Sequence, residues 1–442
     1  MTDTTVTAAA GPFHPSRGLY RFAVLIIAGL LTFGSYFAYD SVGALVDTLL
    51  KAWDTDRQAI GGLYTLYSVA AIVVVFLGGM LIDRIGTRAA SLLFSALIVV
   101  GACIVAVAPN VTVAGLGRLV FGAGSESLVV AQNAILARWF RGKELALSFG
   151  LTLAIARLGT LFSFNTEELI ASRLGWQAAL WAAAALCALS LLANLVYWVL
   201  DRRAEKVLGL AEAGAGDKIV LADIRKFGAS YWFVVAMCVT WYSAIFPFTA
   251  LSTDFFHAKW GLPLTAGTGG SFLEGVFVNL LNMFSTAPGT SSIIIFASMC
   301  LAPFAGGLVD RIGRRASLMI LGALLMIPCY LLLAFTMVPP RWPMFLLGAS
   351  FVLVPAAMWP SVPLIVEKNR VGTAFGLMTM IQNIGLGLFP WLNGKLRDVT
   401  QDYTASMLMF AGLGAVGLVF AVLLKRSDAR AGNVLDFTRA GG

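Results

Sequence analysis

The string GMLIDRIGTR at residues 79–88 returns as GGLVDRIGRR at residues 306–315. In both places a long apolar run precedes the string and another follows it, and the two copies lie half a chain length apart. A polar turn duplicated at matching positions predicts two homologous halves, each built of membrane-spanning helices. Such a repeat is typical of proteins that move solutes across membranes.

The composition supports a membrane protein. The chain has 442 residues, of which 59% are hydrophobic and 12% charged, and its mean hydropathy is +0.85. A soluble protein has about 25% charged residues, so this chain cannot cover a water-facing surface of its size. The apolar residues fall in long runs, which is the signature of a polytopic membrane protein.

Cysteine and histidine usage argues against metal or redox chemistry. The five cysteines lie inside apolar runs without a CxxC pair, and the two histidines, His14 and His257, are far apart. The cysteines are interpreted as small core residues. The histidines are too far apart in sequence to suggest a zinc or haem site. No nucleotide-binding loop and no hydrolase or metalloprotease motif is present. We therefore expect no metal, no cofactor, no ATP motor and no enzymatic activity.

The apolar runs predict an all-α integral membrane fold of 12 transmembrane helices in two six-helix halves. The predicted spans are residues 21–47, 59–82, 89–108, 113–139, 144–170, 176–200, 228–255, 288–309, 316–337, 343–365, 372–394 and 404–424. The expected organisation is an N-terminal tail 1–20, a first half 21–200, a linker 201–227, a second half 228–424 with an outward insert at about 257–290, and a C-terminal tail 425–442.

The distribution of Lys and Arg predicts the orientation. With the N-terminus inside, the inner segments carry about three times as many Lys and Arg as the outer segments. Both termini are therefore expected in the cytoplasm, which requires an even number of spans. This topology also accounts for the net charge of +8, so we expect the lipid bilayer and not nucleic acid as the partner of the basic residues. A monomer is expected.

The insert at 257–290 is unusual because it combines several Gly and Asn residues with an apolar run, 272–284. That run is too short to span a bilayer. It fits an interfacial helix on an outward loop, and the alternative is a re-entrant or gating element.

The duplicated turn follows the pattern Gly-x-x-x-Asp-Arg-x-Gly-x-Arg between the second and third span of each half, and it resembles the signature loop of the major facilitator superfamily. Gly86 permits a sharp turn, and an aspartate at a helix end can bond backbone donors or a neighbouring arginine. A simple positive-inside anchor is the alternative. The conformational candidates are Asp83, Arg84, Arg88, Asp310, Arg311 and Arg314.

The string RLVFGAG at 118–124 resembles the pattern that the same superfamily carries in its fourth span. Arg118 and Gly122 are four residues apart and therefore share a helix face. Arg118 is expected to have a structural or coupling role in preference to a ligand contact.

Charged residues within spans usually have a use, since each costs about 2.5–3.5 kcal/mol on insertion scales. Glu126 lies near the middle of the fourth predicted span and Arg157 near the middle of the fifth. A short turn joins these spans, so they are expected to be antiparallel neighbours with the two charges at similar depth. Three interpretations remain open: a structural ion pair, a binding site for the two ends of a zwitterion, and a proton carrier at Glu126.

A narrower resemblance rests on seven short strings. They are GSYFAYD at 34–40, GSESLVVAQN at 124–133, KEL at 143–145 with AR at 156–157, YSAIFPF at 242–248, and GTAFG at 372–376 with IQN at 381–383. Together they are similar to the lysosomal dipeptide transporter family of the major facilitator superfamily and its bacterial relatives. The resemblance implies movement of dipeptides, with Glu126 and Arg157 binding the two peptide termini. It also implies a multi-pass plasma membrane protein, in the bacterial inner membrane. The chain departs from that family in its insert after His257.

Further candidates surround the expected cavity. Asn133 lies nearly two helical turns from Glu126 and shares its face. Asp40, near the outer end of the first span, either caps a kink beside Gly43 or lines the entrance. The other substrate-binding candidates are Gln132, Tyr36, Tyr39, Trp241, Tyr242, Trp359 and Asn383, although aromatic residues in spans also serve packing and lipid contact.

The leading hypothesis is a secondary transporter that moves dipeptides or other small zwitterions by alternating access, either as a uniporter or linked to protons. Within transport, the alternatives are a monocarboxylate or organic-anion carrier, which would need the arginine without the acid, and a drug exporter, whose cavity Arg157 disfavours. A non-transporting membrane sensor is the alternative of another class, but the polar segments are too short for a signalling domain.

Overall fold

The computed structural model describes residues 13–15, 17–140, 144–208, 221–267, 270–367 and 370–436. These residues form helices and no β-strand. The first part of the chain holds α1 (Gly18–Ala44), α2 (Val46–Ala52), α3 (Arg57–Val107), α4 (Val111–Phe140), α5 (Leu145–Leu174), α6 (Trp176–Leu208) and the 3₁₀ helix η1 (Leu221–Lys226). The second part holds α7 (Ala229–Thr249), α8 (Ser252–Trp260), α9 (Phe272–Leu281), η2 (Met283–Ser285), α10 (Ala287–Ile312), α11 (Arg315–Phe335), α12 (Arg341–Met358), η3 (Trp359–Ser361), α13 (Val362–Ile365), α14 (Val371–Thr400) and α15 (Thr404–Arg430).

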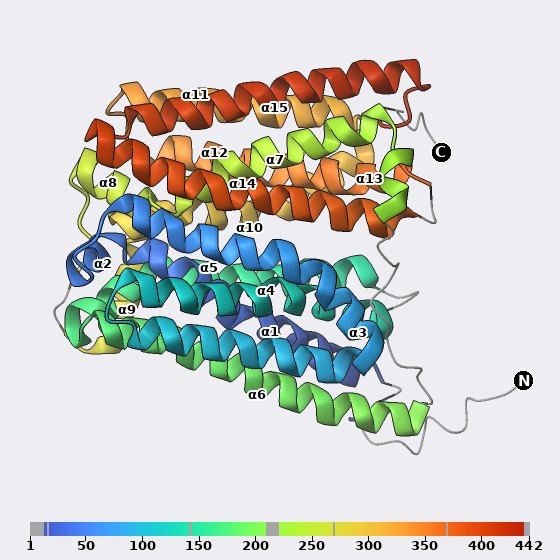
Figure 1. Ribbon diagram of the computed structural model, residues 1–442, viewed down its shortest axis with the longest axis horizontal. Coiled ribbons are helices and arrows are strands. Elements are labelled where there is room, and N and C mark those ends of the chain that lie inside the picture. The colour runs from blue at the N-terminus through green and yellow to red at the C-terminus, as the bar shows by residue number, and fades with distance from the viewer. Residues whose placement is uncertain are drawn as a thin grey trace, which may run out of the picture.

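The long helices form two bundles that lie side by side, α1–α6 in one and α7–α15 in the other (Figure 1). The start of α1 and the end of α15 lie at the same end of the molecule, which we call the terminal end (Figure 1). The opposite end carries α2, α8 and α9, and we call it the distal end (Figure 1).

Eleven helical segments of the described residues are long and apolar enough to cross a membrane. α10 has a shorter apolar stretch, Ala287–Ala302, but as a whole it runs alongside the others and is the twelfth long segment (Figure 1). Large apolar side chains along these helices are exposed, for example Leu116 at 60% and Val199 at 67%. Their exposure suits a lipid environment and would be unfavourable in water.

The predicted spans 59–82 and 89–108 lie in one continuous element, α3. The two parts meet at Gly86, whose φ of 80° and ψ of 158° interrupt the helix. A positive φ of this size is strained for any residue with a Cβ, so glycine permits the bend in the first copy of the duplicated turn.

Proline shapes the predicted span 343–365. α12 ends at Met358 and is followed by the short helices η3 and α13. Pro355, Pro360 and Pro363 occupy this region, and each lacks the backbone N–H that a continuing helix would use.

The expected boundaries at the polar segments also shift. α6 continues to Leu208, beyond the predicted linker start at 201, and residues 209–220 lie outside the described part of the chain. α15 continues to Arg430, beyond the predicted end at 424. Asp428 is buried and accepts hydrogen bonds from the backbone N–H groups of Leu435 and Asp436, so part of the expected polar tail is packed.

Two hydrophobic cores reveal how the bundles meet. One core lies within the first bundle and includes Phe94, Phe121 and Leu128. The other fills the second bundle but also takes in residues of the first bundle near the distal end, such as Leu49 and Trp53. The two bundles are therefore packed into one core at the distal end.

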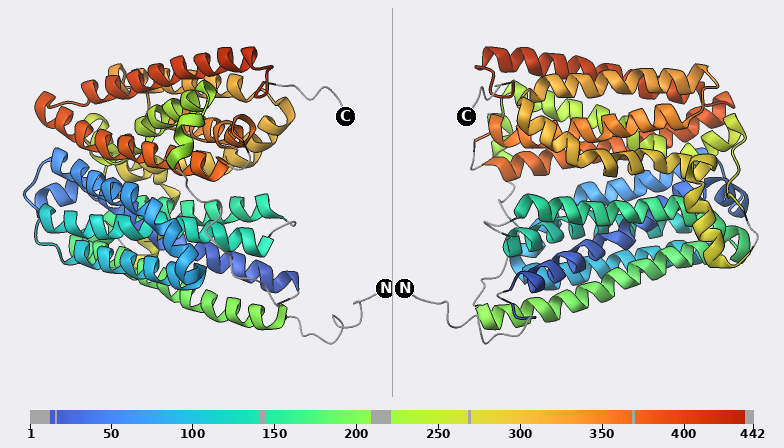
Figure 2. Two further views of the ribbon diagram at one scale, coloured as in Figure 1. Left: turned by 45° about the vertical axis from the view of Figure 1, so that its right-hand side comes forward. Right: turned by 180° about the vertical axis from the view of Figure 1, so that it is seen from behind.

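The insert crosses from one bundle to the other. Ser271 precedes α9 as its N-cap and forms a capping box with Glu274. α9 packs through Gly275 against Leu169 and Arg173 of α5. Figure 2 shows α9 at the distal end of the first bundle, although it follows α8 of the second. Its outward face carries Leu273 at 78% exposure. These contacts fit the interfacial-helix interpretation of the insert.

Candidate functional site

Glu126 lies near the middle of α4 and is partly exposed. The Tyr67 hydroxyl of α3 donates a hydrogen bond of 2.8 Å to its Oε1. Tyr67 is itself buried. A carboxylate at mid-span is therefore held in one orientation and retains capacity to accept further hydrogen bonds.

Arg157 lies near the middle of α5 and is also partly exposed. Its guanidinium lies over three aromatic rings, at 5.4 Å from the centroid of Tyr36, 5.5 Å from Phe246 and 5.0 Å from Phe351. Tyr36 belongs to the first bundle, whereas Phe246 and Phe351 belong to α7 and α12 of the second. Cation–π contacts position the side chain but do not satisfy its N–H donors.

Glu126 and Arg157 are not joined by an ion pair, and in the part of the chain that is described Arg157 forms neither a hydrogen bond nor an ion pair. The Asp40 carboxylate is the anion that interacts electrostatically with it at longer range. The interpretation of the two charges as a closed structural ion pair is therefore not supported by the geometry. The Glu126 carboxylate therefore remains available to accept hydrogen bonds, and the Arg157 guanidinium remains available to donate them.

A buried cation connects Glu126 to the outer part of α1. Arg118 of α4 is 1% exposed and donates to the backbone carbonyls of Ala38 and Tyr39, at 3.1 and 3.2 Å. The rings of Tyr39 and Tyr67 surround its guanidinium, with centroids at 5.1 and 5.5 Å. Arg118 therefore ties α4 to α1 and packs against the tyrosine that orients Glu126.

Aromatic residues of the second bundle lie next to Arg157. Trp359 donates from Nε1 to the Tyr242 hydroxyl at 3.0 Å, and Tyr242 stacks on Phe246 with centroids 5.8 Å apart. Phe246 is one of the rings next to Arg157. Tyr242 and Trp359 therefore lie in the aromatic layer that supports this cation.

The structure does not bring every candidate to this site. Trp241 is fully buried and stacks on Phe351 at 5.5 Å, so it supports that ring from behind. Asn383 is 1% exposed and donates to the carbonyl of Thr379 in its own helix. Gln132 is buried and its amide donates to α1, at 2.7 Å from the Ala28 carbonyl oxygen.

Asn133 and Asp40 differ from one another in exposure. Asn133 is exposed, on the face of α4 that carries Glu126 and closer to the terminal end. Asp40 is 7% exposed and accepts a hydrogen bond of 2.6 Å from Thr160 of α5. Asp40 therefore links α1 to the helix of Arg157.

The two copies of the duplicated turn have different surroundings. In the first copy, Arg88 contacts Glu205 at 2.7 Å and the buried Asp201 at 3.5 Å, both in α6. Arg84 is exposed. In the second copy Arg311 and Arg314 are also exposed. The side chains of Asp83 and Asp310 lie outside the described part of the structure.

A polar network joins the bundles at the distal end, and we call it the distal lock. Arg57 of α3 donates to both carboxylate oxygens of Asp254 in α8, at 2.6 and 2.7 Å, and lies 3.7 Å from Asp398 of α14. The Tyr403 hydroxyl also donates to Asp254. Asp398 accepts a hydrogen bond of 2.8 Å from the backbone N–H of Gln58.

Sequence reasoning missed the distal lock and several residues of the central site. Tyr67, Phe246 and Phe351 lie in apolar spans where an aromatic residue has no distinctive signal. Arg57 and Asp254 were visible as charges at the ends of predicted spans, but they are 197 positions apart in sequence. Only the packing of the bundles brings them together. Among the described residues, no cluster of His, Cys, Asp or Glu is arranged to hold a metal ion.

Two bundles of membrane-crossing helices with unpaired charges at mid-depth define a membrane transporter. Residues 28–301 and 281–440 match the model of the Major Facilitator Superfamily. The chain belongs to the major facilitator superfamily.

Its curated relatives include the "Lysosomal dipeptide transporter MFSD1" of Danio rerio, 35% identical over 428 residues that cover 94% of this chain and 88% of that protein. The protein of the same name from Homo sapiens is 32% identical over 440 residues, which cover 96% of this chain and 90% of that protein.

Solved structures of transporters share the fold. The D323A mutant of the nucleoside transporter NupG gives a TM-score of 0.70 at 16% identity, covering 91% of this chain and 99% of that one. The peptide transporter POT in complex with sulfate gives 0.70 at 13% identity, covering 94% and 96%. At such identities the likeness shows the fold alone.

Proposed function

We propose that this protein is a secondary transporter that moves dipeptides or similar small zwitterions by alternating access, with Glu126 binding the ligand's ammonium and Arg157 its carboxylate. The observation that carries the proposal is that Arg157, a cation at mid-span, forms no hydrogen bond and no ion pair among the described residues. A charge in this position is costly unless it has a function.

The geometry suits a ligand with two opposite charges. The Tyr67 hydrogen bond orients Glu126, and three aromatic rings fix the plane of Arg157, so both groups are prepared before a ligand arrives. A charge-assisted, bidentate contact between a guanidinium and a carboxylate adds both energy and direction. The name of the relatives, lysosomal dipeptide transporter, supports a dipeptide as this ligand.

The proposal includes an orientation. The excess of Lys and Arg in the segments at the terminal end supports placing that end, with both chain termini, in the cytoplasm. The distal end then faces outward, in the bacterial inner membrane. Because the bundles share a core and a polar lock at the distal end, we propose that this conformation is closed to the outside.

Counterflow in proteoliposomes tests the proposal. Vesicles loaded with unlabelled dipeptide should accumulate labelled dipeptide, and Glu126→Gln and Arg157→Gln should each reduce uptake by at least tenfold. Absence of counterflow with any dipeptide would exclude the substrate class. Competition by lactate but not by dipeptides would favour the organic-anion alternative.

Dipeptides with one blocked terminus test which residue binds which end of the peptide. N-acetylation removes the ammonium, so it should weaken competition strongly in the parent protein but little in Glu126→Gln. C-terminal amidation should show the same relation to Arg157→Gln. If N-acetylation weakens competition equally in Glu126→Gln and in Arg157→Gln, the assignment of the two peptide ends is wrong.

Proton linkage is a further part of the proposal to test. Of the two charged groups in the site, Glu126 is the one that can take up and release a proton, because it forms no ion pair with Arg157. Uptake that follows an imposed pH gradient would favour proton-linked transport. Uptake that follows only the dipeptide gradient would favour a uniporter.

A further inference from the structure

Asp40 of α1 lies close to the central site without being one of its two binding groups. Arg157 stacks on Tyr36 of α1, and Asp40 follows Tyr36 by one helical turn in the same helix. Thr160, which follows Arg157 by nearly one turn in α5, donates a hydrogen bond of 2.6 Å to the Asp40 carboxylate. Residues three or four positions apart share one face of a helix. Asp40 therefore lies about one helical turn from Arg157, toward the distal end.

Two arginines compensate the charge of Asp40 at a distance. Asp40 is buried and forms no ion pair within the described residues. Arg157 and Arg118 both act on it electrostatically. Arg118 is held in place by its bonds to the carbonyl oxygens of Ala38 and Tyr39, which directly precede Asp40 in the chain. Asp40 is therefore a counter-charge that two guanidinium groups share without a direct ion pair.

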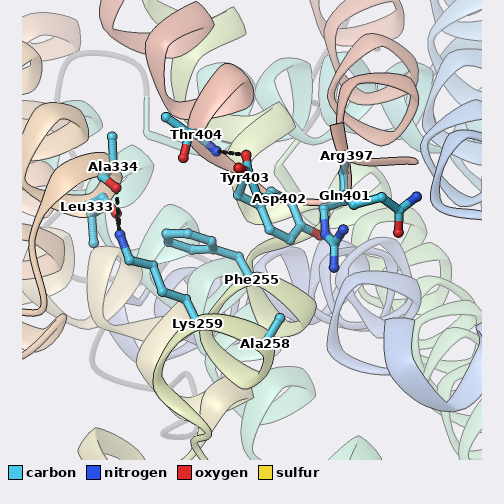
Figure 3. Close-up of a pocket in the computed structure, with 10 residues that line it drawn as sticks. All are labelled: Phe255, Ala258, Lys259, Leu333, Ala334, Arg397, Gln401, Asp402, Tyr403 and Thr404. Carbon is cyan, nitrogen blue, oxygen red and sulfur yellow. Dashed lines mark hydrogen bonds between the residues drawn. The ribbon is translucent and has the colours of Figure 1, made fainter. Parts of the chain in front are cut away.

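Charges at the distal end of the second bundle are compensated differently, by direct contacts. Figure 3 shows a cavity there, in which Lys259 donates to the carbonyl oxygens of Leu333 and Ala334. In the same cavity, Asp402 accepts a hydrogen bond of 2.8 Å from the backbone N–H of Thr404. These groups are used within the fold and give no indication of a ligand. The carboxylate in α1, in contrast, acts through the electrostatic potential that it creates around the two arginines.

The first bundle supplies the charged residues around Arg157. Of the adjoining helices of the second bundle, α7 contains no charged residue and α12 has only Arg341, at its first position. The next acidic residues along α5 are Glu167 and Glu168, about three helical turns beyond Arg157. The potential at the site is therefore set mainly by two acids and two arginines of α1, α4 and α5.

We propose that Asp40 is a specificity-determining residue, which sets the net charge of the ligands that the site accepts by cancelling the charge of Arg118 beside Arg157. This role rests on the proposed function, because Glu126 and Arg157 must hold the two ends of the ligand. Asp40 acts on the ligand through the electrostatic potential and not through contact. The class of ligand that this balance favours is the zwitterion without net charge.

The selection follows from the sum of the charges. The two acids, Glu126 and Asp40, balance Arg118 and Arg157, so the surroundings match a ligand without net charge. When the charge of Asp40 is removed, the surroundings carry one net positive charge. Anionic ligands then bind more tightly and cationic ligands more weakly. Charges in a partly buried site are screened less than in bulk water, so the difference is measurable across a helical turn.

Competition experiments in proteoliposomes test this role. Counterflow of labelled Ala-Ala is inhibited by unlabelled Ala-Ala, Ala-Glu or Ala-Lys, which at neutral pH are net neutral, anionic and cationic. The membrane potential is held at zero, so that it does not favour either charged dipeptide. The readout is the apparent inhibition constant of Ala-Lys divided by that of Ala-Glu.

Asp40→Asn should raise this ratio at least tenfold over that of the parent protein. The amide oxygen of asparagine can still accept the hydrogen bond of Thr160, so the variant loses the charge with little change in shape. Asp40→Ser removes the same charge with a smaller side chain and should give the same rise, which keeps the test decisive if Asp40→Asn does not fold. A purely structural role of Asp40 would weaken the binding of all three dipeptides alike.

Ser41→Ala is the matched control, because it alters the next residue of α1, which is also buried, without changing a charge. The ratio in Ser41→Ala should stay within about twofold of the parent value. An unchanged ratio in the Asp40 variants, or an equal rise in Ser41→Ala, would overturn the selection by charge and leave the proposed function standing. Absence of Ala-Ala counterflow in the parent protein would instead exclude the proposed function, and this role with it.

Discussion

Arg57 and Asp254 form a two-pronged hydrogen-bonded ion pair, with N–O distances of 2.6 and 2.7 Å, between α3 of the first bundle and α8 of the second. The Asp254 side chain is 2% exposed and that of Arg57 is 25% exposed. An ion pair of this geometry is directional, and losing one partner leaves the other buried and uncompensated. The pair is therefore suited to hold the distal end shut in one conformation.

Asp254→Asn should shift the protein toward opening at the distal end. The amide cannot accept two charge-assisted bonds from Arg57, and we expect the closed state to lose about 2–3 kcal/mol. Spin-label distances between the distal ends of the two bundles would measure the change. An unchanged distance distribution, in a variant that still folds, would contradict a locking role.

Gly61→Ala should also shift the protein toward opening at the distal end, because the added methyl group would clash with α14. A Cβ at Gly61 would lie 2.2 Å from the backbone oxygen of Pro390 in α14, a distance that requires the helices to separate. Gly62→Ala is the matched control, since its Cβ would meet only Trp391 at 4.0 Å. The same spin-label measurement should show opening for Gly61→Ala alone, and an equal response of the two variants would refute the close packing of α3 on α14.

The distal lock should also respond to pH through Asp47 in α2. Burial, with the nearby Asp254 carboxylate, raises the pKa of Asp47 to about 6. Burial also raises the pKa of Asp254, but the hydrogen bonds and charge of Arg57 outweigh it and leave that pKa below its ordinary value. Asp47 therefore stabilises the folded state when protonated, and this contribution is lost as pH rises through about 6. The contribution of Asp254 persists at neutral pH and is lost only in acid.

We expect stability to fall by about 1–2 kcal/mol between pH 5 and pH 7.5, and Asp47→Asn to remove most of that fall. Thermal unfolding at the two pH values measures it. His257 lies close enough to act electrostatically on Asp47, so His257→Asn serves as the control. A pH dependence that survives in Asp47→Asn and disappears in His257→Asn would assign the effect to the histidine.

Tyr67→Phe should raise the KM for dipeptide uptake by about three- to tenfold. The change removes the 2.8 Å hydrogen bond that orients Glu126 and leaves the ring against Arg118 in place. Tyr64→Phe is the control, because the Tyr64 hydroxyl is buried on the same helix and makes no hydrogen bond to Glu126. Uptake kinetics that are equal in the two variants would remove Tyr67 from the site.

Asp201→Asn should destabilise the first bundle by about 3 kcal/mol. Asp201 is fully buried and accepts from Arg138 at 2.7 Å and from Trp139 at 3.0 Å, and Arg88 lies 3.5 Å away. Glu205→Gln removes only the more exposed partner of Arg88 and should cost less than 1 kcal/mol. The melting temperatures of the two variants give the comparison, and a Glu205→Gln loss as large as that of Asp201→Asn would contradict it.

The sequence by itself determined the class of protein. Apolar runs of spanning length, the repeated turn and the placement of Glu126 and Arg157 within spans are local properties, because the cost of burying charge and backbone in lipid acts on each segment separately. For this reason the membrane fold, the two halves and the central charges were predictable without any contact information.

Only the tertiary structure decided which side chains meet. Gln132 and Asn383 carry the same amide as Asn133, yet packing buries the first two and leaves the third exposed on the face of Glu126. Tyr67 on Glu126, Phe351 on Arg157 and Asp254 on Arg57 are contacts between helices that are remote in sequence. Their partners depend on the rotation and register of whole helices, which are set by the combined packing of both bundles and by no single segment.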